Sequence, residues 1–472
     1  MRPVRLLRRV IHLAAAAAAA ALLAPASAPA VPASVGIAAL NAQREANGIP
    51  GGIVEDPAWS VGCDHHISYL QANGGNLTHD ELRGRPGYTA DGDSAGNSSV
   101  LSLGDSWTTG NPWETAPIHL HQLLGPRLSV TGVADRDRYV CMVTWPGYQR
   151  PAPADWITYT YPGPGVVGYA FEETAFESPF TPGEKVGIPQ GTKTGAYLYV
   201  MFDGPFDHAT ARTTAASLTG PDGPVAIAVV DNDTPDVGGY LPPGMELIPR
   251  RPLRPRTTYT ASIAASLHAS TEFAVLDQPV EHTWSFTTSG RPNSASVRVQ
   301  RDQRHPTFLK VRVDSEAPHA VLTVTRPDGT TVQPTLRHRV ARVQAATAGR
   351  WRFCATSGGD ATEYEAAQRC VTRSFATTVD FALPTRVRHG RLRLNVPPAL
   401  VGRHARVDLW AYTMMGRARA RHTVRLKRHT ILAMPTIPGA IRWWVDLRVR
   451  RFQRGATPYG AIHLNRAYDH IT

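Results

Sequence analysis

The chain has 472 residues, of which 42% are hydrophobic and 19% charged, and its formal net charge is +12 at pH 7. This length is enough for roughly three domains with separate cores. Beyond residue 30 no run is long and apolar enough to span a bilayer, which excludes a chain anchored by a transmembrane helix.

The charge is divided unevenly along the chain. Residues 31–290 contain 14 Lys and Arg against 27 Asp and Glu, whereas residues 291–472 contain 32 against 11. The basic half is nearly all arginine, since Lys310 and Lys427 are its only lysines. Such asymmetry bears on association with partners rather than on the fold.

Residues 1–30 have the pattern of a secretory signal peptide. Four arginines come first, an alanine-leucine run follows, and the segment ends in Ala28-Pro29-Ala30. We predict cleavage after Ala30 and a secreted, extracellular protein with no transmembrane segment.

Four cysteines in an exported chain predict two disulfides. Cys63 and Cys141 lie in one region and Cys354 and Cys370 in another, which suggests local pairing, although three connectivities are possible in principle. No pair has the short spacing of zinc thiolates, so a cysteine metal site is a poor alternative.

Residues 34 to about 148 indicate mixed helix and strand. We predict helices near 36–47, 56–73 and 114–124, and strands near 99–103, 128–134 and 138–145. Asn47-Gly48 would end the first helix, because these residues tolerate the left-handed conformation of a helix C-cap.

A succession of short motifs in this region resembles a known family. The fragments are Leu40-Asn41-Ala42-Gln43-Arg44, then Thr78-His79-Asp80-Glu81, Ala95-Gly96-Asn97-Ser98 and Ala116-Pro117-Ile118-His119. Their order and spacing are similar to the bacterial branch of the CAP superfamily, the SCP-like secreted proteins. The resemblance implies an α-β-α sandwich over residues 31–150, with two histidines and two acids facing a shallow cleft that can hold a divalent cation.

The resemblance names the candidate cleft residues. His79 and His119 would be the two histidines and tentative ligands of zinc, which neutral imidazole suits. Glu81, Asn97 and Asp105 are further candidates. The chain departs from the family where Gly96 stands in place of a glutamate and where Ile118 precedes the second histidine.

An alternative site lies within the same region. The segment Val100 to Gly110 contains Gly104-Asp105-Ser106 after an apolar strand, which resembles the nucleophile block of GDSL-type serine hydrolases. Ser106 would need a histidine to deprotonate it. The block is not at the start of the domain, and no convincing Asp-x-x-His pair follows it before the β-rich region, so this alternative is the weaker one.

The remainder of the chain reads as β-structure. Pro and Gly mark a linker near residue 150, and alternating apolar runs separated by Gly, Pro and Asp then predict an Ig-like β-sandwich over 151–290. We expect a β-rich domain over 291–380 and a basic β-rich C-terminal domain over 381–472. The fold class is therefore α+β: a CAP-like domain followed by two or three all-β sandwiches.

The arginines of the last domain recur at alternate strand positions, which puts one charged and one apolar face on each strand. Anionic wall polymers or phospholipid head groups are nearer partners of an exported chain than nucleic acid. They could bind there through the basic clusters Arg417, Arg419, Arg421, Arg425, Lys427 and Arg428, with Arg448, Arg450, Arg451 and Arg454. Solvated strand faces in an arginine-rich sequence are the simpler explanation.

The function that the sequence favours is binding rather than catalysis. We expect the cleft to engage a small apolar or metal-bridged ligand, or a lipid or cell-envelope component, with the β-domains acting as spacers or adhesion modules. A secreted hydrolase, using His79 and His119 with a metal or using Ser106, and a purely structural surface protein are the alternatives. Analogy to a family is a weak basis for function.

Overall fold

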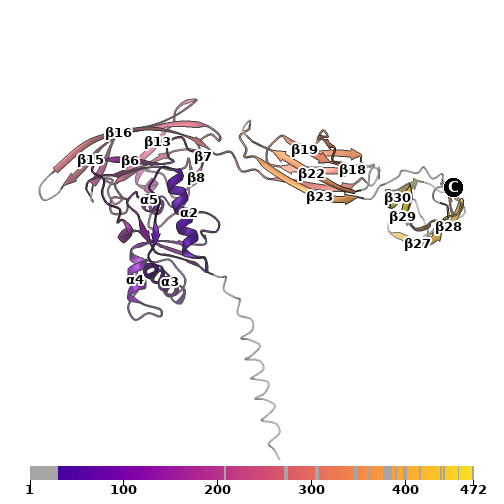
Figure 1. The fold of residues 1–472 in the computed structure, drawn as a ribbon, viewed down its shortest axis with the longest axis horizontal. Helices are drawn as coiled ribbons and strands as arrows, with labels where there is room; N and C mark the ends of the chain where they lie inside the picture. Colours follow the sequence, from indigo (N-terminus) through magenta and orange to yellow (C-terminus); the bar gives the residue numbers. More distant parts are fainter. Residues whose placement is uncertain are drawn as a thin grey trace, which may run out of the picture. The chain divides into compact units, whose positions relative to one another are not determined.

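The computed structural model describes residues 30–206, 209–270, 275–302, 308–344, 349–359, 362–375, 385–388, 391–396, 401–413, 416–435, 438, 442–454 and 457–469. The chain forms two compact units, Met1–Ser289 and Gly290–Thr472. Figure 1 shows the elements of each unit. The predicted signal peptide lies, apart from Ala30, outside the described residues.

The first part of unit 1 combines helices with short strands. Its elements are α2 (Ala33–Ala46), β1 (Val54–Glu55), α3 (Pro57–Ala72), α4 (Ala90–Asn97), β2 (Ser99–Leu103), α5 (Pro117–Leu124), β3 (Val130–Thr131), β4 (Val133–Arg136), β5 (Tyr139–Val143) and the 3-10 turn η1 (Trp145–Gly147). The side chain of Asp56 caps α3 by accepting from the N–H groups of Ala58 and Trp59, directly before a proline that suits the first helical turn.

A three-stranded antiparallel sheet in the order β2-β5-β4 lies between two groups of helices. Val100, Val140 and Met142 belong to a core that includes side chains of α2 and α5. Their strand neighbours Leu101 and Cys141 belong to a second core with α3 and α4. The two faces separate because successive side chains of a strand point to opposite sides.

A buried arginine ties α2 to the end of α5. Arg44 is fully buried, and its guanidinium donates to the carbonyl oxygens of Pro50 at 2.9 Å, Leu123 at 2.6 Å and Gly125 at 3.0 Å. Burial lowers the pKa of Arg44 to about 9, so the side chain still carries its charge at neutral pH. The last carbonyls of a helix have no partner within the helix, and Arg44 supplies one.

The second part of unit 1 is a β-sandwich. Its elements are β6 (Ile157–Tyr161), β7 (Val167–Tyr169), β8 (Glu173–Thr174), η2 (Pro182–Val186), β9 (Lys193–Thr194), β10 (Leu198–Asp203), β11 (Ala209–Gly220), β12 (Gly223–Pro224), β13 (Ile227–Asp231), β14 (Gly244–Pro249), β15 (Thr258–Ser270) and β16 (Val275–Thr288). The two large sheets have the orders β13-β14-β10-β6 and β12-β11-β15-β16-β7.

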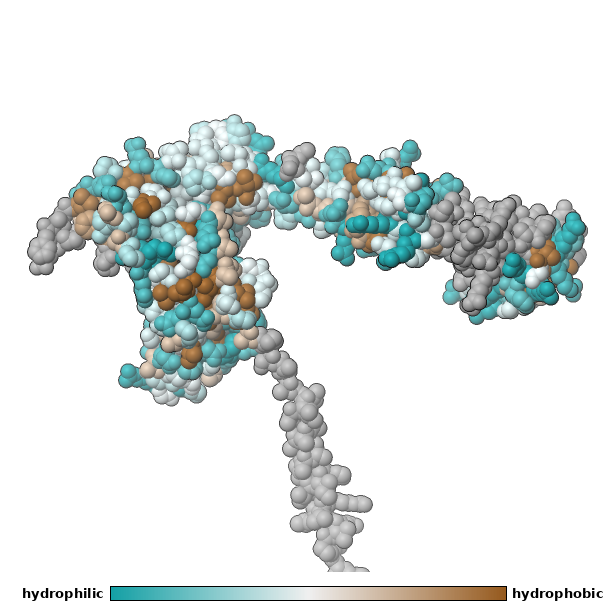
Figure 2. Space-filling model, viewed as in Figure 1, coloured by the Kyte–Doolittle hydropathy of each residue, from teal (hydrophilic) through white to brown (hydrophobic). Residues whose placement is uncertain are grey.

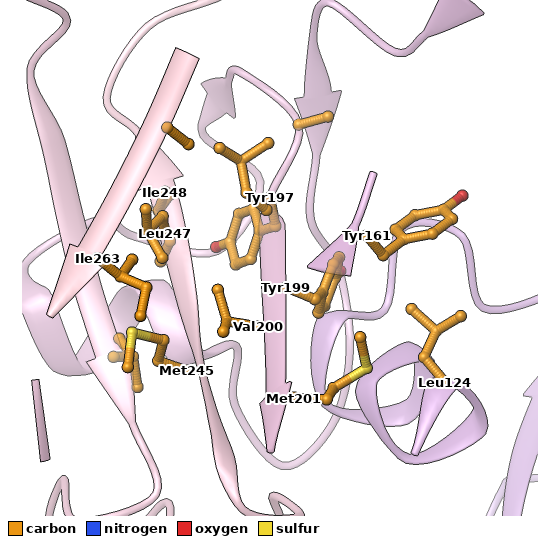
Figure 3. Close-up of a cluster of buried hydrophobic side chains, with 14 of the residues drawn as sticks. Leu124, Tyr161, Tyr197, Tyr199, Val200, Met201, Met245, Leu247, Ile248 and Ile263 are labelled. Carbon is orange, nitrogen blue, oxygen red and sulfur yellow. The ribbon is translucent and has the colours of Figure 1, made fainter. Parts of the chain in front are cut away.

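Helix α5 covers the outer face of the sheet that contains β10. Figure 3 shows Val200 pointing toward Met245 and Ile263, whereas Met201 points toward Leu124 of α5. Seven of the eight residues of α5 are buried, His121 and Gln122 among them, so the helix is packed on nearly every side. The sandwich and α5 therefore share one core.

Unit 2 consists of two further pairs of sheets. The first pair uses β17 (Ala295–Arg301), β18 (Phe308–Ser315), β19 (Ala320–Thr325), β20 (Thr331–Val332), β21 (Val340–Gln344), β22 (Gly349–Ser357) and β23 (Ala367–Phe375). The second uses β24 (Thr385–Arg388), β25 (Arg391–Asn395), β26 (His404–Tyr412), β27 (Arg417–Arg425), β28 (His429–Ala433), β29 (Arg442–Arg454) and β30 (Thr457–Asp469). The sheet orders are β17-β18-β21 with β20-β19-β22-β23, and β24-β25-β28 with β27-β26-β29-β30.

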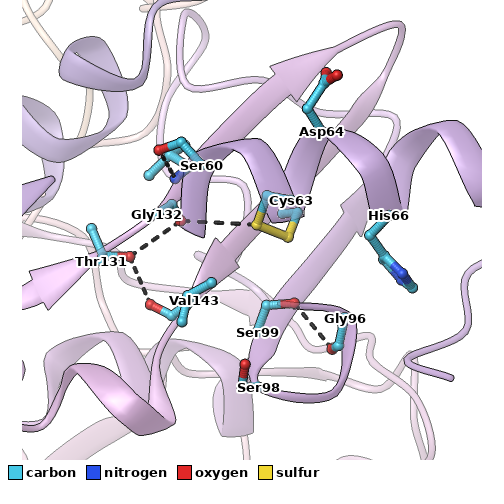
Figure 4. Close-up of a disulfide and its surroundings, with 12 residues drawn as sticks. Ser60, Cys63, Asp64, His66, Gly96, Ser98, Ser99, Thr131, Gly132 and Val143 are labelled. Carbon is cyan, nitrogen blue, oxygen red and sulfur yellow. Dashed lines mark hydrogen bonds between the residues drawn. A yellow bond between two sulfur atoms is a disulfide. The ribbon is translucent and has the colours of Figure 1, made fainter. Parts of the chain in front are cut away.

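The structure confirms the predicted β-rich character and both predicted disulfides. Cys63 pairs with Cys141 and Cys354 with Cys370, and no free cysteine remains. Figure 4 shows the first disulfide beneath α3. Over the described ranges, no helix has the length and apolar character needed to cross a bilayer. The sequence did not predict α4, whose Asp, Gly and Ser residues are more typical of a loop.

Candidate functional site

His79 lies in the loop between α3 and α4, and the backbone fixes its tautomer. Its Nδ1 is 2.8 Å from the carbonyl oxygen of Gly96, near the end of α4. A carbonyl oxygen can only accept, so Nδ1 carries the hydrogen, and the lone pair of the neutral ring is on Nε2. The free nitrogen is therefore the one that could bind a ligand or a metal.

His119 lies in the first turn of α5, and a carboxylate from the sandwich region fixes its tautomer in the same way. Oε2 of Glu177 lies 2.9 Å from Nδ1 of His119 and also accepts from the N–H of Ile118 at 3.0 Å. Since this oxygen acts as an acceptor, Nδ1 of His119 donates and Nε2 keeps its lone pair. Burial raises the pKa of Glu177, and the bond from His119 opposes that rise.

Glu177 also replaces the missing N-cap of α5. Ala116 precedes the helix and has no side-chain acceptor. Glu177, which is 59 positions after Ile118, supplies the acceptor. The N–H of Phe176 donates to the carbonyl oxygen of Thr115 at 2.9 Å and so holds this segment beside the helix. A negative charge is stabilised at this end of a helix by the unpaired N–H groups and the helix dipole.

The two imidazoles are close enough for their charges to interact. Desolvation lowers the pKa of His79, and the nearby rings of His119 and His66 lower it further, although the bond to Gly96 acts in the opposite direction. Like charges oppose each other's protonation. His79 is solvent-exposed and the side chain of His119 is 13% exposed, so a ligand can reach both rings.

The structure places Glu81 in the interior, away from the candidate cleft. Its Oε1 is 3.0 Å from Nδ1 of His66, both side chains are fully buried, and Oε2 accepts from the N–H of Thr89 at 2.9 Å. Nε2 of His66 lies 2.8 Å from the carbonyl oxygen of Thr78 and must donate to it. One further proton is therefore held between His66 and Glu81, either on the ring or on the carboxyl group.

Gly96 leaves the space that this pair occupies. A Cβ at Gly96 would lie 2.4 Å from Cε1 of His66 and 2.5 Å from the carbonyl oxygen of His79. Figure 4 shows His66 on α3 with Gly96 nearby at the end of α4. The buried histidine therefore excludes any side chain at position 96.

The other candidate residues do not join the histidines. Asn97 is exposed, and its Nδ2 donates to the carbonyl oxygen of Asp93 at 3.0 Å, one turn earlier in its own helix. Asp105 is exposed in the turn after β2. Ser106 donates to Oδ2 of Asp135 at 2.8 Å and contacts Oγ1 of Thr108. No histidine is among these partners, so the described contacts give Ser106 no general base.

The donor set for a metal therefore consists of the two Nε2 atoms. No group of three or more His, Cys, Asp or Glu side chains suited to a metal ion occurs among the residues that the structure describes. Structural zinc sites have four protein ligands and catalytic sites usually three. The pair fits a cation that takes its remaining ligands from water or from a bound molecule.

A depression of about 440 Å³ lies beside the loop that carries His79. It is lined by Tyr69, Leu70, Ala72, Asn73, Asn76, Leu77, Thr78, Leu82, Arg85 and Pro86. Leu77 and Leu82 are exposed, and Thr78 directly precedes His79. An apolar group could occupy this surface next to the first histidine.

Sequence reasoning missed Glu177 and the buried pair of His66 and Glu81. Glu177 is 58 residues from His119 and belongs to a segment that was assigned to another domain, so no local spacing indicated the contact. The sequence gives only a weak signal for His66, because its neighbour is also a histidine. The two differ in the fold, where His66 lies on the inward face of α3 and His65 is exposed.

No protein-family model matches the chain, and no curated protein matches it. Solved structures with some likeness include the FN1–FN3 domains of chicken CNTN1, at 11% identity and a TM-score of 0.18 over 57% of this chain and 93% of that one. A tandem repeat from the extending region of a large adhesion protein has 14% identity and a TM-score of 0.21, over 58% and 70% of the two chains. Two fibronectin type-III domains of chicken tenascin have 13% identity and a TM-score of 0.17, over 37% and 98%. Likenesses this remote say nothing about what this chain binds.

Proposed function

We propose that this chain is a secreted binding protein whose CAP/SCP-like cleft holds a small ligand between His79 and His119, with a divalent cation such as zinc as the bridge. The observation that carries the proposal is the tautomer that the two rings share. Each Nδ1 donates to a fixed acceptor, Gly96 O or Glu177, and each Nε2 keeps its lone pair.

The chemistry of the pair suits a metal. Histidine ligands of metals commonly donate their second ring N–H to a carboxylate or a backbone carbonyl, which are the two acceptors present here. A bound zinc ion would polarise a ligand oxygen as a Lewis acid. Glu177 would fix the ring of His119 as a ligand, because the carboxylate accepts its Nδ1 hydrogen.

The packing of residues 30–150 supports the CAP-like assignment. The β2-β5-β4 sheet has one core with α2 and α5 and another with α3 and α4, as an α-β-α sandwich requires. The depression beside Thr78 supports a ligand with an apolar part. The β-units would then serve as spacers or cell-envelope adhesion modules.

A hydrolase is the second candidate, and the His119–Glu177 pair is what favours it. A carboxylate that orients an imidazole is the arrangement of a general base. No nucleophile is in contact with that base among the described residues, so binding remains the function that the geometry supports better. A purely structural role is the outcome to expect if the cleft binds nothing.

The deciding experiment is a calorimetric titration of the full chain with zinc. We expect stoichiometric binding, loss of binding in the double variant His79→Ala, His119→Ala, and about 10- to 100-fold weaker binding for Glu177→Gln, which keeps an acceptor but loses the charge. The matched control is His65→Ala, His268→Ala, because both are exposed histidines paired with an aspartate and neither belongs to the candidate pair.

Binding that survives in the cleft variant, or that falls equally in the control, would contradict the proposal. Ester hydrolysis that depends on His119 in the presence of zinc would favour the metal-assisted hydrolase. Hydrolysis abolished by Ser106→Ala alone would favour the serine hydrolase.

A further inference from the structure

Strands β26 and β27 form one apolar face and one basic face at the edge of the sheet β27-β26-β29-β30. On β26 the alternate residues Ala405, Val407, Leu409 and Ala411 are buried. The residues between them, Arg406, Asp408 and Trp410, therefore lie on the opposite face. The register with β27 places Arg421 opposite Asp408 and Arg419 opposite Trp410.

A single buried carboxylate holds three arginines of this face in place. Asp408 accepts from Nε of Arg406 at 3.1 Å, from Nη2 of Arg419 at 2.9 Å and from Nε of Arg421 at 2.8 Å. Three cations around one anion leave an excess of two positive charges. Burial raises the pKa of Asp408, but the bonds from Arg421 and Arg419 outweigh it and keep that pKa below its usual value.

The guanidinium groups remain accessible although they are fixed. The side chains of Arg406, Arg419 and Arg421 are 38%, 37% and 47% exposed. The bonds of Arg406 and Arg421 to Asp408 use Nε, so both of their Nη groups take no part in them. Figure 2 shows a hydrophilic surface over β27. Arginines held in one geometry lose less side-chain entropy when they bind an anion.

Arginines occupy most of the alternate positions along β27. Arg417, Arg419, Arg421 and Arg425 are all exposed on this strand, and Thr423 stands between the last two. Alternate residues of a strand are about 6.8 Å apart, so the row is about 27 Å long. The row has the length to follow an extended polymer rather than a single ion.

We propose that the Arg417–Arg419–Arg421 face of β26 and β27 is a binding surface for an anionic polysaccharide, whose sulfate or carboxylate groups would pair with the guanidinium forks. Guanidinium matches such planar or branched oxyanions through two parallel hydrogen bonds. The inference is independent of the histidine cleft, because it concerns the other unit of the chain.

The structure favours a polysaccharide over nucleic acid. Proteins bind single strands by stacking bases on aromatic rings, but the ring of Trp410 is covered by Arg419 at 4.5 Å and Arg417 at 5.4 Å from its centroid. The face belongs to a four-stranded sheet, whereas the major groove of a duplex admits a helix or a two-stranded β-ribbon. Recognition by charge alone is suited to a flexible chain of repeated anions.

Protection of a sheet edge is the competing explanation. β27 has no partner on its outer side among the described strands, and charged residues commonly prevent edge strands from pairing with another molecule. That role predicts aggregation when the arginines are removed, with no change in affinity for a polyanion.

The test measures binding of the full chain to a size-defined heparin oligosaccharide at two salt concentrations. We expect the double variant Arg417→Gln, Arg421→Gln to bind at least tenfold more weakly and with a smaller dependence on salt. Arg417→Lys, Arg421→Lys keeps the charge without the fork and should be intermediate. The matched control is Arg369→Gln, Arg373→Gln, which removes the same charge from exposed positions of β23 and should change affinity less than twofold.

Several results would overturn the proposal. One is equal heparin affinity of the glutamine variant and the unaltered chain, with or without aggregation in size-exclusion chromatography. Another is an equal loss in the control, which would show that only total charge matters. Tighter binding of an oligonucleotide or of phosphatidylserine vesicles at the same arginines would assign the surface to those partners instead.

Discussion

At the scale of single residues, Gly96 explains how this chain departs from its candidate family. The buried ring of His66 occupies the place of a side chain at position 96, and Glu81 is the partner that makes the buried ring tolerable. A buried polar group without a hydrogen bond costs about 1–3 kcal/mol, so ring and carboxyl group depend on each other. One acid of the expected cleft therefore stabilises the interior instead.

Replacement of Gly96 by alanine should destabilise unit 1 by about 1–3 kcal/mol, because the new methyl group meets His66 and a backbone oxygen that cannot move freely. Alanine is intrinsically favoured over glycine in a helix by about 1 kcal/mol, so a stabilised variant would show that the contact relaxes easily. Urea denaturation measures the change, and Gly239→Ala, where nothing lies within 4 Å, is the control.

At the scale of elements, the two disulfides restrict the unfolded chain to different extents. Cys63–Cys141 joins α3 to β5 and closes a separation of 78 residues. Cys354–Cys370 links directly opposed residues of β22 and β23, 16 residues apart, in strands that are already paired. Loop-closure entropy grows with the length of the closed loop, so the first cross-link restricts the unfolded chain more.

Removal of the first disulfide should therefore cost more than removal of the second. Chain-entropy arguments give about 4.5 kcal/mol for Cys63→Ala, Cys141→Ala and about 3 kcal/mol for Cys354→Ala, Cys370→Ala. Hydrogen exchange followed by mass spectrometry reports the change in β2 and β5 for the first variant and in β22 and β23 for the second. A larger loss of protection in the second variant would show that native-state effects outweigh loop entropy.

At the scale of the whole molecule, unit 1 buries three acids where α5 meets the sandwich. Glu246 lies opposite Tyr199 in the sheet, and its Oε1 is 3.2 Å from Nδ1 of His121 on α5. Burial raises the pKa of Glu173 to about 8 and that of Glu246 well above its usual value, and it lowers the pKa of His121 to about 3. Glu173 and His121 are therefore largely uncharged at neutral pH.

Unit 1 should be more stable at pH 6 than at pH 9. A buried acid with a raised pKa contributes its full stability below about pH 4.5 and loses it as the pH rises through the folded value, about 8 for Glu173. His121, whose pKa is lowered, acts in the opposite direction and reduces stability only below about pH 6.5. Thermal melting at both pH values measures the difference, and we expect Glu173→Gln to reduce it by roughly 2–4 kcal/mol.

The matched control for that experiment is Glu281→Gln, an exposed glutamate on β16. Glutamine at position 173 can still accept from the N–H of Tyr197, which Glu173 now does at 3.1 Å. An unchanged pH dependence in Glu173→Gln would mean that this carboxyl group is ionised in the folded protein at neutral pH.

Much of the architecture could be predicted from local pattern. The strands of β10, β18, β19 and β22 follow runs of alternating or continuous apolar residues, and α3 lies within the range predicted for the second helix. The pattern failed for α4, whose residues favour loops and whose helix is held by contact with α3 and by the Thr89 cap. Propensity is a weak guide where tertiary contacts decide the conformation.

The sequence by itself determined the β-rich architecture and the two local disulfides, because side-chain periodicity and cysteine distribution are local properties, whereas His79 and His119 as a binding pair stay a prediction. Only the tertiary structure decided which acids serve those histidines. Glu81 turned inward to His66, and Glu177 reached His119 from a segment 58 residues away. The physical reason is that the tautomer, the pKa and the charge of a group depend on its neighbours in space. For His119 the packing of α5 against the sandwich sets those neighbours.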